Sequence, residues 1–168
     1  MIVSLSLLLL SSPIFCQFTI TKANLPDSAK HYTLLVEKFV QLDINADHFN
    51  NASIPKKETQ QFIKKFNKHL TKHNNKLDQL LKKHFNFDYK LVNPSSLSNY
   101  DSMRYPFILK RDLIKILNGK TSTAGHFSFT NYIENRKDNK RYKDIDIFYK
   151  SYWKSLKLAI IVLDAYLE

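Results

Sequence analysis

Residues 55–85 read PKKETQQFIKKFNKHLTKHNNKLDQLLKKHF, and this stretch carries the strongest periodic pattern in the chain. Successive residues of an α-helix turn by about 100°. At that spacing the apolar side chains gather within an arc of about 100°; they are Phe62, Ile63, Phe66, Leu70, Leu77, Leu80 and Leu81. The phase holds across Asn74 and Asn75. The pattern therefore predicts one helix about 46 Å long, with any kink at these two asparagines.

The opposite side of the same predicted helix is strongly basic. Its lysines are Lys57, Lys64, Lys65, Lys68, Lys72, Lys76, Lys82 and Lys83, and only Glu58 and Asp78 dilute them. A solvated helix face usually mixes charges of both signs, which allows pairing along the helix. A Lys-rich surface can also reflect nothing more than a biased composition. The functional interpretation is a surface that binds an anionic partner.

A second basic cluster lies near the turn of a predicted hairpin and consists of Arg136, Lys137, Lys140, Arg141 and Lys143. With 26 Lys and Arg against 15 Asp and Glu, the formal net charge is +11. The two clusters predict an anionic macromolecule as partner: an acidic protein, a surface polymer or lipid head groups. Lysine is a point charge on a flexible stem and distinguishes little beyond charge, so specific nucleic-acid recognition is not expected.

The other elements follow from capping residues and periodicity. Asp27 or Ser28 is expected to cap a first helix, whose apolar face would be Tyr32, Leu35, Val36, Phe39 and Val40. Residues 86–92 alternate and predict a short strand. Residues 111–117 predict a short helix that ends at Asn118-Gly119, with a hairpin through the Asn-Gly turn as the competing interpretation. Residues 126–134 and 141–144 predict two strands around a turn at Asp138-Asn139, and residues 145–167 predict the last helix.

These elements together indicate an α+β fold that is mainly helical. Two long amphipathic helices, 55–85 and 145–167, are expected to pack together through their apolar stripes. A short β-hairpin or small antiparallel sheet would close one end. Residues 17–168 are expected to form this single domain, because the length suits one ordinary domain.

The first sixteen residues, MIVSLSLLLLSSPIFC, resemble a secretory signal peptide. Ile2 to Leu10 is an apolar run without charge, Ser11 to Pro13 break it, and polar sequence follows from Gln17. The run is shorter than the roughly 20 residues that span a bilayer. We therefore expect residues 1–16 to be removed and the protein to lie outside the cytoplasm, in the periplasm or secreted. No transmembrane helix is expected after that removal.

Composition excludes several kinds of site. Gly119 and Gly125 are the only glycines and Cys16 is the only cysteine, so phosphate-binding glycine loops, disulfide frameworks and cysteine-based metal sites are ruled out. His69 and His73 have the spacing of two metal ligands on a helix, but no third ligand accompanies them. Because both lie at or inside the apolar arc, they are interpreted as core or boundary residues. No metal and no cofactor is predicted.

A catalytic function is the weaker interpretation. Its candidate residues would be His126, Glu134, Asp144 and Asp146, since paired carboxylates and a histidine can carry out acid–base chemistry at a suitable separation. Asp144 and Asp146 are better explained as caps of the last helix. The leading hypothesis is an exported, basic, non-catalytic binding module. The alternatives are a small cofactor-free extracytoplasmic enzyme and a structural protein of the cell envelope. The oligomeric state cannot be inferred from the sequence.

Overall fold

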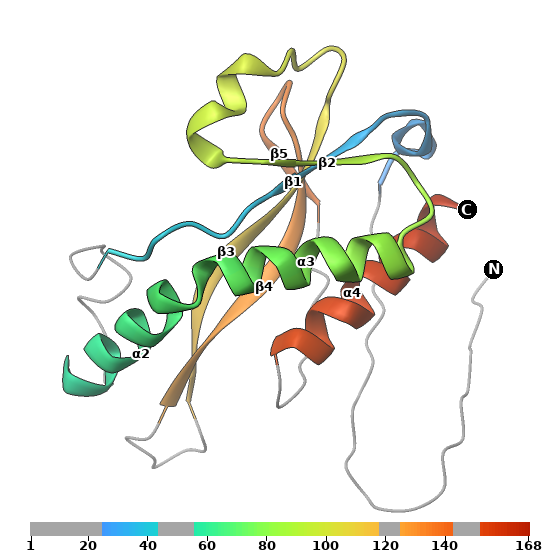
Figure 1. The fold of residues 1–168 in the computed structure, drawn as a ribbon. Coiled ribbons are helices and arrows are strands. Elements are labelled where there is room, and N and C mark those ends of the chain that lie inside the picture. Colours follow the sequence, from blue (N-terminus) through green and yellow to red (C-terminus); the bar gives the residue numbers. More distant parts are fainter. Residues whose placement is uncertain (1–24, 44–55, 118–124, 143–151) are drawn as a thin grey trace, which may run out of the picture.

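The computed structural model describes residues 25–43, 56–117, 125–142 and 152–168 (Figure 1). Its helices are the 3-10 helices η1 (Asp27–His31) and η2 (Pro94–Asn99) and the α-helices α2 (Lys56–Lys68), α3 (Leu70–His84) and α4 (Tyr152–Leu167). Its strands are β1 (Leu34–Glu37), β2 (Tyr89–Val92), β3 (Phe107–Leu117), β4 (Gly125–Asn135) and β5 (Lys140–Tyr142). The predicted leader, residues 1–16, lies outside the described residues.

The strands form one mixed sheet of five strands in the order β2-β1-β3-β4-β5. The short strand β1 runs parallel to both of its neighbours, β2 and β3. β3, β4 and β5 are successive antiparallel strands, and β3 pairs with β4 over its full length of eleven residues. Parallel neighbours need a crossover connection, because the chain must return to the same end of the sheet. Between β1 and β2 that connection contains α2 and α3.

The main core lies between the sheet and the α-helices, which cover one of its faces (Figure 1). Leu34, Val36 and Leu109 of the sheet pack there with side chains of α3 and α4. On the other face, Leu35 and Ile108 pack with Leu97 and the tyrosines near η2. Side chains of a strand alternate between the two faces, so β1 is buried on both sides.

The sheet contradicts the expected fold of two long helices packed with a small hairpin. The predicted first helix does not exist beyond η1, and residues 34–37 instead form a strand near the centre of the sheet. Leu35 and Val36 are both completely buried, one on each face. A strand buried on both faces shows a continuous apolar run, which periodicity alone does not distinguish from a helix.

The predicted short helix at residues 111–117 is also wrong, because this segment is the second half of β3. An antiparallel pair of strands takes its place, while the Asn118-Gly119 turn of the competing hairpin interpretation lies outside the described residues. β3 and β4 pair from Phe107↔Asn135 to Leu117↔Gly125. The smaller hairpin of β4 and β5 was predicted, and Asn139 in its turn has a φ of 54°, a conformation that Asn tolerates well.

The long helical stretch is divided at His69 and not at Asn74. His69 has φ −108° and ψ 17°, outside the helical range, and its N–H donates to the carbonyl of Phe66, three residues earlier. That tightened turn separates α2 from α3. The two helices follow each other end to end with a bend between them (Figure 1). The apolar side of the pattern is nevertheless buried in both helices, as at Phe66 and Leu77, while the lysines are exposed.

Two asparagine side chains attach the segment after β1 to these helices. The Asn74 amide accepts a hydrogen bond from the Phe39 N–H at 2.8 Å and donates one to the Phe39 carbonyl at 3.0 Å. The Asn67 amide makes the same pair of bonds with Leu42, at 2.9 and 3.0 Å. An amide side chain offers one acceptor and one donor group, as a neighbouring strand would. These bonds therefore hold residues 39–42 against α2 and α3.

The last helix, α4, packs against α3 as part of the core. Leu77 and Leu81 of α3 belong to the same buried cluster as Leu156 and Ile160 of α4. Asp164, which is 8% exposed, accepts hydrogen bonds from the backbone N–H and the side-chain amide of Asn86 just after α3. Residues 145–151 of the predicted last helix lie outside the described residues. None of the helices described here has the length and apolar character needed to cross a membrane.

The two-sided burial of β1 gives the first prediction. Leu35→Ala should lower the free energy of unfolding by about 2–5 kcal/mol, because it removes a completely buried side chain from the less extensive face of the core. Val40→Ala, three residues after β1 and 47% exposed, should change it by less than about 0.5 kcal/mol. Urea denaturation of both variants provides the measurement. Equal losses would contradict a strand at residues 34–37.

Candidate functional site

The lysine face of α2 and α3 consists of the eight residues Lys57, Lys64, Lys65, Lys68, Lys72, Lys76, Lys82 and Lys83. All eight are exposed. At about 100° per residue they fall within an arc of about 120°, opposite the buried Ile63, Phe66 and Leu77. Lys82 pairs with Asp78 at 2.7 Å, and the Lys76 ammonium lies 4.7 Å from the centre of the Trp153 ring. The sequence pattern therefore located this surface, although its binding function stays a prediction.

The predicted hairpin cluster does not behave as one basic patch. The Arg136 guanidinium donates to the carbonyls of Tyr105, Leu97 and Tyr100 at 3.0, 3.0 and 2.7 Å, and so holds η2 and the residues after it. The Arg141 guanidinium bonds to Asp112 at 2.7 Å and lies over the Tyr132 ring. These two arginines hold parts of the fold together.

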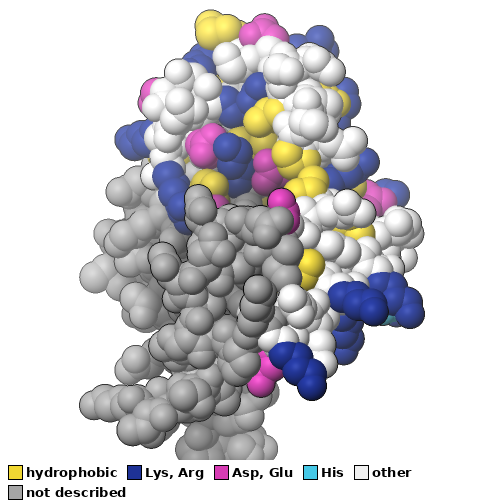
Figure 2. Space-filling view, turned by 90° about the vertical axis from the view of Figure 1, so that its left-hand side faces the viewer, with side chains coloured by type: hydrophobic (Ala, Val, Ile, Leu, Met, Phe, Trp, Pro, Cys, Tyr) yellow, Lys and Arg dark blue, Asp and Glu magenta, His cyan; other side chains and the backbone are white. Residues whose placement is uncertain are grey.

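The remaining members of that cluster are lysines. Lys137 and Lys140 are exposed, and the Lys140 ammonium lies 5.4 Å from the centre of the Tyr142 ring. Lys143 lies outside the described residues. Figure 2 shows Lys and Arg side chains at several separate places on one face of the molecule, with acidic and hydrophobic side chains between them. In Figure 1 the β4–β5 turn lies far from α2, so the two predicted clusters are separate surfaces.

The candidate catalytic residues are not brought together by the described part of the chain. Glu134 forms an ion pair with Lys110 at 2.6 Å, on the sheet face that bears η2. His126 belongs to β4, and the position of its side chain is not described. Asp144 and Asp146 lie outside the described residues. The structure thus gives Glu134 a charge partner within the sheet.

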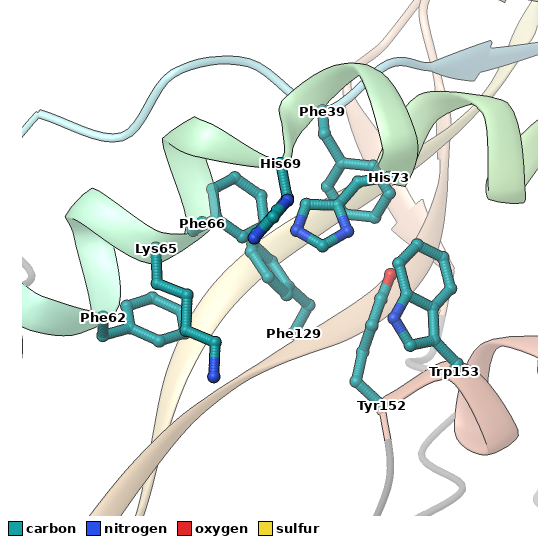
Figure 3. A pocket seen from close by; sticks show the side chains of 9 residues that line it. All are labelled: Phe39, Phe62, Lys65, Phe66, His69, His73, Phe129, Tyr152 and Trp153. Atoms are coloured by element: carbon teal, nitrogen blue, oxygen red, sulfur yellow. The ribbon is translucent and has the colours of Figure 1, made fainter.

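A cavity of about 290 Å³ that the sequence analysis did not predict lies between α2, α3, β4 and the start of α4. We call it the aromatic chamber. Its lining consists of Phe39, Phe62, Lys65, Phe66, His69, His73, Phe129, Tyr152 and Trp153. Figure 3 shows the six aromatic side chains coming from four parts of the chain, with His73 among them between Phe66 and Trp153. No lining residue is acidic, and three carry or can gain positive charge.

His73 is a member of this aromatic cluster. Its ring stacks on Phe66, with centroids 4.9 Å apart, and lies 5.5 Å from the Trp153 ring. Burial lowers the pKa of His73, and the nearby His69, Lys76 and Lys72 lower it further. The neutral imidazole is therefore favoured inside the chamber. The sequence analysis placed His73 on the apolar arc, and the lowered pKa agrees with that position.

A buried polar cluster lies beside the aromatic chamber and consists of Arg111, Asn131 and Tyr152. The Arg111 guanidinium donates through Nη1 to the Glu37 carbonyl, and its carbon lies 4.3 Å from the centre of the Phe39 ring. Its Nε and Nη2 atoms, Asn131 Oδ1 and the Tyr152 hydroxyl are buried without a hydrogen bond of good geometry, a property that no other buried side-chain polar atom in the described residues shares. Such a concentration is unusual, because buried polar groups are normally hydrogen-bonded. The Tyr152 hydroxyl nevertheless lies near enough to Arg111 for a hydrogen bond between them to act on both pKa values.

The ionisation of this cluster reflects its burial. Burial lowers the pKa of Arg111, which remains far above neutrality in any protein. Burial raises the pKa of Tyr152 although the neighbouring Arg111 charge opposes that shift. Glu37, whose charge acts on Arg111, also has a raised pKa because of burial. The cluster thus holds a permanent cation beside a neutral phenol.

Arg111 borders a second cavity of about 460 Å³, on the side of Phe39 away from Trp153. Glu37, Asp112 and Leu113 also line it. Phe39, Phe66 and Phe129 line both cavities, so the two cavities adjoin at these rings. The sequence offered one signal for the buried polar cluster. Side chains alternate between the two faces of a strand, so Arg111 of β3 lies on the same face as the apolar Leu109 and Leu113.

The three carbonyl contacts of Arg136 predict that it stabilises the fold, unlike its exposed neighbour Lys137. Arg136→Lys should lower the free energy of unfolding by about 1–3 kcal/mol, because an ammonium cannot bond to all three carbonyls in the geometry of the guanidinium. Lys137→Ala, the exposed neighbour, should leave stability within about 0.5 kcal/mol of the original protein. Chemical denaturation measures both. No loss for Arg136→Lys would show that η2 is held by other contacts.

The lowered pKa of His73, and of His84 at the end of α3, predicts acid sensitivity. Both histidines are neutral in the folded and unfolded states well above the ordinary pKa of 6.5, so stability is full there. As the pH falls below that value, the unfolded chain takes up protons first, and stability declines until the lowered folded pKa is passed. Replacing both with Gln should flatten the stability profile between about pH 7 and 5.

Urea denaturation at a series of pH values tests this prediction, with His69→Gln as the exposed control on the same helical stretch. The control should keep most of the slope of the original protein. A double variant with an unchanged slope would show that other groups cause the acid sensitivity.

Comparison with known proteins assigns no function to these surfaces. No protein-family model matches the chain, and no curated protein and no solved structure matches it either. The functional argument therefore rests on the lysine face, the aromatic chamber and the buried polar cluster themselves.

Proposed function

We propose that this protein is an exported, basic, non-catalytic binding module that contacts an extended anionic partner through the lysine face. The observation that carries the proposal is the exposure of eight lysines on one side of α2 and α3, of which Lys82 alone forms an ion pair with a carboxylate of its own helix. A row of like charges raises the local electrostatic potential and attracts polyanions. Export is the sequence-based part of the proposal.

The length of the lysine face favours an extended polymer over a small ion. Residues 56–84 span about 44 Å at 1.5 Å per residue, and the lysines run from Lys57 to Lys83. Lysine side chains distinguish little beyond charge and spacing. The aromatic side chains near them, such as Phe62 and Phe66, take part in the chamber and the core, so base stacking does not support nucleic-acid recognition. An acidic surface polymer is the partner that these features support best.

Heparin retention tests this proposal. Lys64→Glu, Lys68→Glu and Lys72→Glu together should lower the elution salt strongly, and should reduce the slope of log affinity against log salt by about 3, since each lost lysine removes about one contact. None of the three lines the aromatic chamber. Lys30→Glu, Lys90→Glu and Arg104→Glu form the matched control, with the same change in net charge at exposed positions outside α2 and α3.

The control triple should reduce retention only slightly if the lysine face is the binding surface. Binding to polyglutamate and to vesicles with anionic lipids at low salt identifies the kind of partner. Equal effects of the two triples would show that net charge alone explains retention. Failure of the original protein to bind any of these polyanions at low salt would leave the lysine face as an ordinary solvated surface.

A further inference from the structure

The buried Arg111 presents one unused edge. Its Nη1 atom is bonded to the Glu37 carbonyl, whereas Nε and Nη2 make no hydrogen bond of good geometry among the described residues, although the Tyr152 hydroxyl lies near enough to Arg111 for a hydrogen bond between them to shift both pKa values. Nε–H and Nη2–H point in parallel from one side of the guanidinium, and together they bind the two oxygens of a carboxylate. No acidic side chain of the described residues forms a salt bridge with Arg111. The Nε–H and Nη2–H donors of Arg111 therefore face no carboxylate of the described residues.

The strand register places a second polar group beside it. Arg111 of β3 pairs directly with Asn131 of β4, so both side chains project from the same face of the sheet, toward the helices. Asn131 is 3% exposed, and its Oδ1 has no partner. Tyr152, the first residue of α4, adds a neutral hydroxyl that interacts with the Arg111 charge. Leaving the donors of Arg111 and Tyr152 unpaired costs stability, so they point to a ligand with acceptor oxygens, whereas Asn131 Oδ1 is itself an acceptor and takes no part in binding one.

The aromatic chamber supplies the apolar part of a binding site. Tyr152 belongs to both, since it lines the chamber and its hydroxyl belongs to the buried polar cluster. The chamber volume of about 290 Å³ is close to the lower end of small-molecule sites. Lys65 is the permanent cation of its lining and no acidic residue lines it, which favours a negative ligand.

We propose that the chamber and the buried polar cluster together form a site for a small aromatic carboxylate. The ring of the ligand lies among Phe66, Phe129 and Trp153. Its carboxylate accepts two hydrogen bonds from Nε and Nη2 of Arg111 and a third from the Tyr152 hydroxyl. Because these atoms are covered by neighbouring side chains, the ligand reaches them through a rotamer change of Phe39 or Tyr152. This site does not depend on the proposed function of the lysine face.

Trp153 is the only tryptophan of the chain and lines the chamber, so its fluorescence reports on the site directly. The experiment titrates the protein with 3-phenylpropionate and with its uncharged amide, 3-phenylpropionamide. Acetate and inorganic phosphate serve as anions without a ring. We expect 3-phenylpropionate to change the fluorescence saturably, the amide to bind at least tenfold more weakly, and the two small anions to have no effect in the same range. Calorimetry gives the affinities.

Two variants locate the carboxylate. Arg111→Met should weaken 3-phenylpropionate binding by tenfold or more and should abolish the preference for the acid over the amide. Tyr152→Phe keeps the ring and removes the hydroxyl, so it should weaken binding several-fold and provides the answer if Arg111→Met does not fold. Arg104→Met, an exposed arginine in another part of the chain, should bind as the original protein does.

Several results would overturn the proposal. Equal binding of acid and amide would show that Arg111 does not recognise the carboxylate. A fluorescence change with acetate or phosphate alone would indicate anions at surface lysines near Trp153. No saturable change with 3-phenylpropionate up to millimolar concentration would mean that water, not an aromatic carboxylate, bonds to the buried polar cluster.

Discussion

Burial of both faces of β1 is the constraint on which the arrangement of the other elements depends. Its four residues lie between two parallel neighbours, and parallel pairing excludes a direct hairpin on either side. The chain must therefore leave and return by longer paths. α2 and α3, which lie between β1 and β2 in the sequence, cover one face with α4, and η2, which lies between β2 and β3, covers the other. The helices occupy their positions because β1 needs cover on both sides.

The same strand also explains why a buried cation lies at this point of the fold. β1 pairs with β3 only as far as Leu109, whereas β3 continues to Leu117. Beyond Glu37 the chain turns away from the sheet to meet Asn74 and Asn67. Arg111 lies where the two diverge and bonds to the last carbonyl of β1. A guanidinium at that position continues the hydrogen bonding of the sheet across the gap, and its remaining donors are left beside the aromatic side chains.

The sequence predicted correctly those helices and strands that bury one face and expose the other. The helical period of residues 56–84 and the exposed lysines follow from a single apolar stripe, and the β4–β5 hairpin follows from alternation and a recognisable turn. β1 was missed because Leu34, Leu35 and Val36 are all buried, which removes the alternation that identifies a strand. Residues 113–117 were missed because four of the five are large and aliphatic. The roles of Arg136 and Arg111 depend on carbonyls distant in sequence, so no local pattern reveals them.

The four hydrogen bonds of Asn67 and Asn74 to residues 39–42 restrict how such a sequence can change over evolutionary time. Asn67 and Asn74 contact only the backbone N–H and carbonyl groups of Phe39 and Leu42. The exposed side chains between those residues take no part and are free to drift. Aspartate at either helical position would lose the donor, and glutamine would place the amide one carbon farther out. Among homologues, two asparagines seven residues apart should therefore persist beside a segment whose own exposed residues vary.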